Sequence, residues 1–121
     1  MNKAEWFDKI KLACEDAGTY RPFFDSVIET LAGILERRDD ANRVFEATGG
    51  NVLVTHTNKL GAKNLEQNPA LRLANDLNRD ALAYWRDLGL TPSGLRKLNA
   101  EVVSKENNEG SLEKLLAKIT E

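Results

Sequence analysis

The chain has 121 residues and a mass of 13.5 kDa, a length that is typical of one domain and too short for a large α/β-barrel enzyme. Seventeen basic and nineteen acidic side chains give a net charge of −2, so the overall composition does not indicate nucleic-acid binding. Cys14 is the only cysteine, which excludes an intrachain disulfide and a cysteine-based zinc site. The sequence begins without a signal-peptide pattern and has no run of about 18 apolar residues, so we expect a cytoplasmic protein without membrane contact.

The first half of the chain predicts two helices. Residues 2–17 carry apolar side chains at helical spacing, and Gly18 favours a helix end after them. The second pattern runs from about Tyr20 to Ala47, with Pro22 in its first turn, where a missing N–H costs little. We expect these two long helices to be antiparallel.

The length of the second predicted helix bears on the shape of the protein. About 28 helical residues would span roughly 42 Å, whereas a compact domain of this size has a diameter of about 35 Å. Either the helix breaks near residues 37–40, where charged residues interrupt the apolar stripe, or the protomer is elongated and completes its burial against other copies. We favour the second alternative and expect a ring-forming oligomer.

The second half of the chain predicts a small β element and two further helices. After Gly49 and Gly50, residues 52–55 and 62–66 can form a short hairpin or an ordered loop. Asn68-Pro69 then begins a third helix that ends at Gly89, and Thr91-Pro92 begins a short fourth helix. The predicted fold is therefore mainly α, with two long helices, a hairpin-like loop, a third helix and a short fourth one.

The sequence contains no set of residues that indicates catalysis. His56 is the only histidine and has no cysteine nearby, so it predicts neither a metal site nor proton transfer. Gly49-Gly50 lacks the rest of a phosphate-binding loop. Adjacent carboxylates such as Glu15 and Asp16 point about 100° apart on a helix, which favours solvated faces over a two-metal site. We expect no enzyme activity, no metal and no cofactor.

Local charge gives a different indication from net charge, because residues 48–98 hold seven basic and four acidic side chains. Such a patch can contact DNA phosphates, and a ring of subunits would multiply a weak contact. The first candidates lie in the hairpin and on the fourth helix; they are Lys59, Lys63, Arg96 and Lys97. The second set, on the long helix, is Arg37, Arg38 and Arg43. The alternative is that basic residues such as Arg72 and Arg79 pair with acids along their own helix.

Two groups of apolar residues are candidates for contacts with partners. On the third helix the predicted self-association positions, some of which must also serve the protomer core, are Leu73, Leu77, Ala81, Tyr84 and Leu88. After a polar linker at 105–110, a stripe at helical spacing consists of Leu112, Leu115, Leu116 and Ile119. This stripe either packs back on the core or docks on a partner. We therefore divide the chain into a helical oligomerisation and DNA-binding domain, residues 1–98, and a linker with an amphipathic segment, residues 99–121.

Two motifs resemble a known family. Asn-Pro-Ala-Leu at 68–71 begins a helix of about 20 residues, which ends at Leu-Gly-Leu-Thr-Pro-Ser at 88–93. With the two preceding helices and the glycine-bearing loop, this order resembles the small terminase subunits of tailed bacteriophages over about residues 3–98. Relatives commonly continue with a small residue and an arginine, whereas Gly94 and Leu95 stand here. A role of that arginine would be absent or moved to Arg96.

The resemblance implies a non-enzymatic protein of phage assembly in the host cytoplasm. It implies a homo-oligomeric ring that binds viral double-stranded DNA at the packaging site. It also implies recruitment and regulation of the large terminase subunit, which carries the ATPase and nuclease. Two alternatives remain open: a small regulator that uses the third and fourth helices as a helix-turn-helix, and a helical adaptor without DNA affinity.

Overall fold

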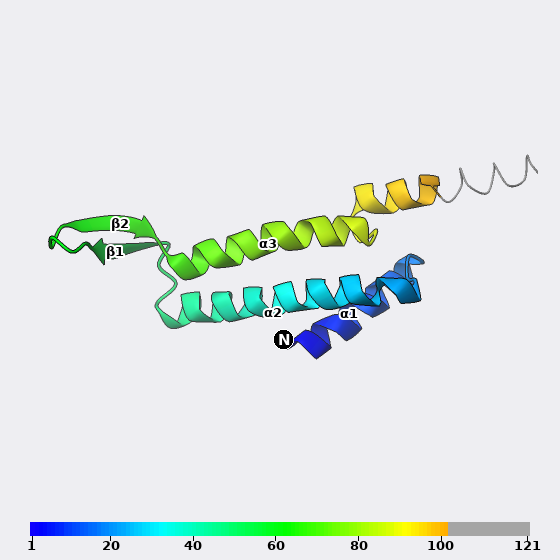
Figure 1. Ribbon diagram of the computed structural model, residues 1–121, viewed down its shortest axis with the longest axis horizontal. Coiled ribbons are helices and arrows are strands. Elements are labelled where there is room, and N and C mark those ends of the chain that lie inside the picture. The colour runs from blue at the N-terminus through cyan, green and yellow to red at the C-terminus, as the bar shows by residue number, and fades with distance from the viewer. Residues whose placement is uncertain (102–121) are drawn as a thin grey trace, which may run out of the picture.

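A computed structural model describes residues 1–101 and shows a mainly helical protomer with one small sheet (Figure 1). The elements are α1 (Lys3–Ala17), the 3-10 turn η1 (Pro22–Phe24), α2 (Asp25–Ala47), β1 (Leu53–Thr57), β2 (Lys63–Gln67) and α3 (Pro69–Asp87). Residues 92–101 are also helical. The predicted fold class is thus confirmed, including the hairpin and the short fourth helix.

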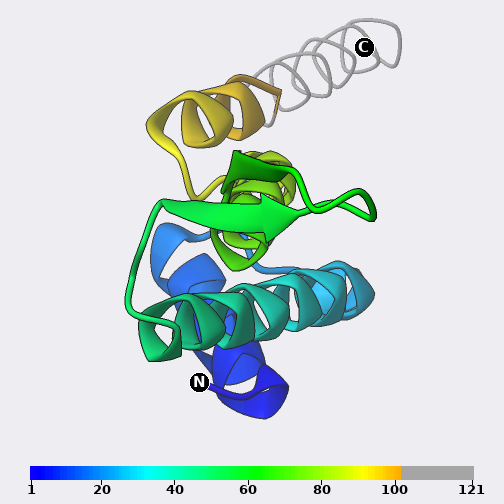
Figure 2. The same cartoon turned by 90° about the vertical axis from the view of Figure 1, so that its left-hand side faces the viewer.

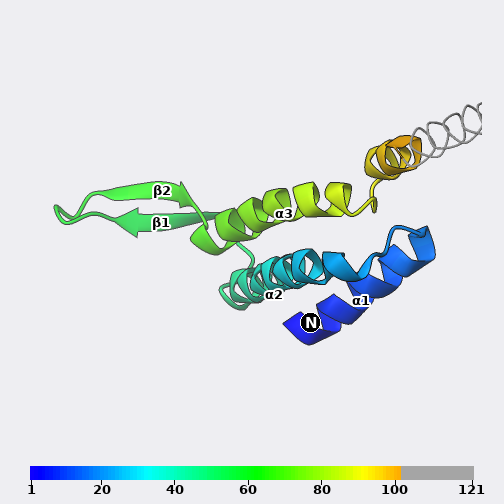
Figure 3. The ribbon, with the colours of Figure 1, turned by 45° about the vertical axis from the view of Figure 1, so that its right-hand side comes forward.

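The protomer is elongated (Figure 1), and α2 lies between α1 and α3 (Figure 2). The longest antiparallel pair is α2 with α3, at 23 and 19 residues, while the 15-residue α1 crosses α2 obliquely (Figure 3). The hairpin projects from one end of this pair, and residues 92–101 lie at the opposite end (Figure 1). The two ends of the molecule therefore carry different elements.

Helix α2 forms the centre of the core. Five consecutive residues, 31–35, are buried, so this part of the helix is covered all round rather than along one stripe. Helix α1 contributes Trp6, Ile10 and Cys14 to the same cluster. Helix α3 and the turn after it contribute the other side, with Leu77, Ala81 and Leu88.

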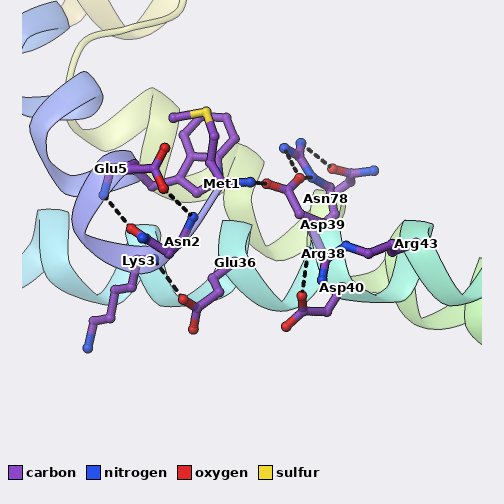
Figure 4. A network of polar contacts seen from close by, with 11 residues as sticks. Met1, Asn2, Lys3, Glu5, Glu36, Arg38, Asp39, Asp40, Arg43 and Asn78 are labelled. Carbon is purple, nitrogen blue, oxygen red and sulfur yellow. Dashed lines mark hydrogen bonds and ion pairs between the residues drawn. The ribbon is translucent and has the colours of Figure 1, made fainter.

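The second helix continues through the charged segment 37–40 without a break, so the alternative of a helix broken there is wrong, whereas burial against other copies stays a prediction. It begins at Asp25 rather than near Tyr20, because Pro22 starts a 3-10 turn that precedes it. The charged residues that interrupt the apolar stripe are accommodated by a polar network, with Asp39 at its centre (Figure 4). Within residues 1–101 no buried side-chain nitrogen or oxygen lacks a hydrogen-bond partner, so the helix continues through a polar segment without burying an unsatisfied group.

The Asp39 network joins all three long helices. The Asp39 carboxylate accepts a hydrogen bond from the Trp6 indole at 2.7 Å and lies 3.2 Å from the α-amino group of Met1. Arg38 donates to the same carboxylate at 2.9 Å and to the Asn78 side chain on α3 at 3.1 Å (Figure 4). Burial alone would raise the pKa of Asp39, but the hydrogen bonds from Trp6, Arg38 and the terminal ammonium outweigh it. The pKa of Asp39 therefore lies below its ordinary value of 3.8.

We predict that Asp39→Asn lowers the free energy of unfolding by about 1–3 kcal/mol at pH 7, because charge-assisted hydrogen bonds to a half-buried carboxylate are lost. A carboxylate with a lowered folded-state pKa stabilises the fold above its unfolded pKa, and this contribution disappears as pH falls through the folded-state pKa. Urea unfolding at pH 7 and through the acid range measures both effects.

Asp40→Asn is the matched control, because Asp40 pairs with Arg43 on the solvent side and both side chains are exposed. Exposed pairs contribute little, so its stability should change by less than about 0.5 kcal/mol. Equal effects of the two substitutions would contradict a stabilising role for the Asp39 network.

Candidate nucleic-acid interface

The hairpin is held in shape by its turn and exposes most of its side chains. The backbone N–H groups of Leu60 and Ala62 both donate to the Asn58 side-chain oxygen at 2.9 Å, and Gly61 adopts φ +83°. This arrangement places Lys59 in the turn and Lys63 at the start of β2, both exposed. The predicted hairpin thus presents its two lysines near its tip.

The base of the hairpin is tied to the start of α3 by Asn68. Its side-chain oxygen accepts from the N–H of Ala70, which caps α3 as predicted, and its amide nitrogen donates to the Asn51 carbonyl at 3.0 Å. The Asn68 backbone N–H also donates to the Val52 carbonyl at 2.7 Å. Because Asn68 is buried and bonded to both sides, the hairpin and α3 are joined at a fixed junction.

At the other end of the molecule, residues 92–101 pack closely on the end of α3. The Thr91 hydroxyl caps this helix by accepting from the Gly94 N–H at 3.1 Å. A β-carbon at Gly94 would collide with the backbone carbonyl of Arg86, so only glycine permits this approach. The approach brings Arg86 and Lys97 to the wall of one pocket of about 330 Å³.

The basic residues predicted to bind DNA fall into three separate groups. Lys59 and Lys63 lie at the hairpin end, whereas Arg96 and Lys97 are exposed on residues 92–101 at the opposite end (Figure 1). The third group lies on α2, between the two ends. The predicted basic residues therefore lie on three different parts of the protomer.

The three arginines of α2 have different surroundings. Arg38 is engaged with Asp39 and Asn78, and its guanidinium lies 5.4 Å from the centre of the Trp6 ring. Arg43 pairs with Asp40 at 2.8 Å. Arg37 is exposed beside the surface between α2 and α3. Of these three, Arg38 already has a role inside the protomer.

The predicted self-association residues differ in how far they are buried within one protomer. Leu77, Ala81 and Leu88 are buried in the protomer core, and Tyr84 packs against it while half-buried. Leu73 is 51% exposed. The first three are therefore covered within one copy, and Leu73 is the member of this set that a second copy could reach. The predicted partner stripe, Leu112, Leu115, Leu116 and Ile119, lies outside the described residues.

Two absences apply to residues 1–101. Within them, no three His, Cys, Asp or Glu side chains gather in a way that could hold a metal ion. The same residues contain no helix that is long and apolar enough to cross a membrane.

Comparison with known proteins gives one family. A family model described as phage terminase, small subunit, matches residues 3–105. The chain belongs to this family. No curated protein and no solved structure shows significant similarity to the chain. A phage terminase small subunit takes part in packaging the viral DNA, and small subunits are in general the non-catalytic, regulatory members of the terminase pair.

Sequence reasoning missed two residues of the candidate interface of this small terminase subunit. Arg86 is nearly a whole helix away from the Asn-Pro start and has ordinary helical neighbours, so no motif singles it out. Gly94 stands out in the sequence only as a departure from the usual pattern. A glycine two residues after the proline of a Thr-Pro helix start is a usable signal, because it permits the close approach between residues 92–101 and α3.

We predict that Gly94→Ala destabilises the protein by about 1–3 kcal/mol, because the added methyl group must displace residues 92–101 from the Arg86 carbonyl. The same displacement moves Arg96 and Lys97 relative to Arg86. Thermal or urea unfolding measures the change.

The control is the same substitution at Gly33, which lies inside α2, where an added methyl group would come no closer than 3.6 Å to a side chain of another residue. Alanine favours helices over glycine, so Gly33→Ala should raise stability by up to about 1 kcal/mol. Stabilisation by both substitutions would contradict the close packing at Gly94.

Proposed function

We propose that this terminase small subunit assembles into a homo-oligomeric ring, binds viral double-stranded DNA, and recruits and regulates the large terminase subunit. The match to the family over residues 3–105 carries this proposal. The elongated protomer, with basic side chains exposed at both ends, supports it. In a ring, each basic group would repeat around one face and form a belt of positive charge.

The strongest candidate for DNA contact is the end formed by α3 and residues 92–101. Here Arg86, Arg96 and Lys97 are exposed, Arg86 and Lys97 line the same pocket, and Gly94 packs residues 92–101 against α3. The acidic neighbours are Asp87 and Glu101. Several phosphate contacts per ring, each weak in one copy, would give salt-sensitive binding. Lys59 and Lys63 form the second candidate group.

We predict that the double variant Arg96→Ala/Lys97→Ala binds phage DNA more weakly and with a smaller dependence on salt. Each lost phosphate contact should lower the slope of log K against log salt concentration by about one unit. Lys59→Ala/Lys63→Ala tests the hairpin group in the same way. Titrations with fluorescent DNA at several salt concentrations measure both variants.

Arg72→Ala/Arg79→Ala is the charge-matched control, because it removes two positive charges from exposed positions on α3 that belong neither to the hairpin nor to residues 92–101. Its affinity should change less than that of the end variants. Unchanged affinity and salt slope in both end variants would show that the DNA contacts lie elsewhere, and no DNA binding by the unmodified protein would favour an adaptor without DNA affinity.

The predicted amphipathic stripe of the C-terminal segment supplies a separate proposal for the large subunit. We predict that truncation after Val103 abolishes stimulation of the large-subunit ATPase, because the four apolar residues of the stripe are removed. Particle mass before and after truncation separates a role in recruitment from a role in assembly. Unchanged stimulation together with unchanged mass would exclude both roles for this segment.

A further inference from the structure

Two unpartnered apolar surfaces lie near the hairpin end of the protomer. The first is one face of the hairpin. Antiparallel pairing places Thr55 opposite Leu65 and Leu53 opposite Gln67, so Leu53 and Leu65 are diagonal neighbours on the same face. Leu65 is 72% exposed and Leu53 is 56% exposed. A two-stranded hairpin is marginally stable in water by itself, so this face needs a covering surface.

The second surface is a groove of about 350 Å³ between the last turns of α2 and the first turns of α3. Its apolar walls include Val44 and Leu73, which are 54% and 51% exposed, and its floor reaches Leu77. Arg37 and Asp40 stand at its polar side. The groove is therefore an apolar depression with a charged rim.

We infer that the hairpin of one copy docks, through its Leu53 and Leu65 face, in the Val44 and Leu73 groove of the next copy. The proposal rests on the self-association proposed above and assigns the surfaces that carry it. The hairpin projects away from α2 and α3 of its own chain (Figures 1 and 3), and the Asn68 junction fixes that direction. The hairpin therefore cannot reach the groove of its own chain, and the hairpin that fills this groove belongs to a neighbouring copy.

Charge favours this pairing over contact between two hairpins. Residues 48–67 carry two lysines and one glutamate, so two hairpins of net positive charge repel each other. The charged side chains that line the groove are one arginine and one aspartate, Arg37 and Asp40, so the groove does not repel a hairpin in this way. A protruding surface that fits a different, concave surface of an identical copy gives head-to-tail contacts, which close into a ring when the rotation permits.

Light scattering of the unmodified protein at micromolar concentration is the first measurement. A mass several times 13.5 kDa is expected. A mass near 13.5 kDa would overturn both the proposed self-association and this inference. If the protein is oligomeric, the following measurements test the assigned surfaces alone.

Engineered cysteines identify which surfaces meet. The double variant Val44→Cys/Leu65→Cys should form a ladder of covalent oligomers after mild oxidation, seen on a gel without reductant. Each single variant should stay monomeric on the gel, because a head-to-tail contact joins unlike positions. The native Cys14 is fully buried, so it contributes no background. A covalent dimer of Leu65→Cys alone would show hairpin-to-hairpin contact and overturn the inference.

Leu65→Cys/Leu82→Cys is the matched control, since Leu82 is exposed on α3 outside the groove lining. It should form no ladder. A ladder of equal yield would show that the cross-links report random collision, and the inference would fall.

An assembly test without cysteines complements the cross-linking. Leu65→Asp should reduce the particle mass while the helical circular dichroism signal is retained. Leu60→Asp should not, because Leu60 is 94% exposed at the turn and lies outside the paired face. Truncation after Val103 should leave both the mass and the Val44–Leu65 ladder intact. Loss of that ladder on truncation would show that the C-terminal segment, rather than the hairpin and the groove, holds the copies together, and it would overturn the inference.

Discussion

The burial of α2 on opposite sides is the constraint on which the rest of this structure depends. One surface of the helix packs on α1 and another on α3, so residues 31–35 are covered all round. A helix in this position cannot be apolar everywhere, because its N- and C-terminal turns reach solvent. Beyond the middle of the helix, the partly buried Asp39 carboxylate is accommodated because it accepts hydrogen bonds from Trp6 on α1 and from its neighbour Arg38.

This central packing also limits where one copy can meet another. Since Leu77, Ala81 and Leu88 are already buried in the protomer core, the proposed self-association requires surfaces outside that core. The exposed apolar side chains near the hairpin end, on β1, β2, α2 and α3, fit that requirement. The opposite end, where residues 92–101 pack on α3 through Gly94, exposes the basic side chains proposed to contact DNA. An elongated protomer thereby separates the proposed contacts between copies from the proposed DNA-binding surface.

The residues of the motifs that resemble the family are also the residues that begin and end α3. The sequence predicts Asn68 as a helix cap, and the structure adds that it joins the hairpin to α3 through its side-chain amide. The sequence also predicts that Gly89 ends α3, and it does so with φ +73°, packed against Thr19 and Leu98. The motifs that resemble the family thus lie at the two ends of α3, where the chain enters and leaves this helix.

Local patterns in the sequence were sufficient for the helices, their caps, the hairpin and the family, because spacing, capping residues and turn residues act within a few positions along the chain. They did not determine which apolar residues of α3 face α2, since Leu73 and Leu77 have equivalent helical spacing but different exposure. They also placed Lys59, Lys63, Arg96 and Lys97 in one basic region, although the hairpin and residues 92–101 lie at opposite ends. Only the tertiary structure decided these points, because the 19 residues of α3 hold the two groups apart along the long axis of the molecule.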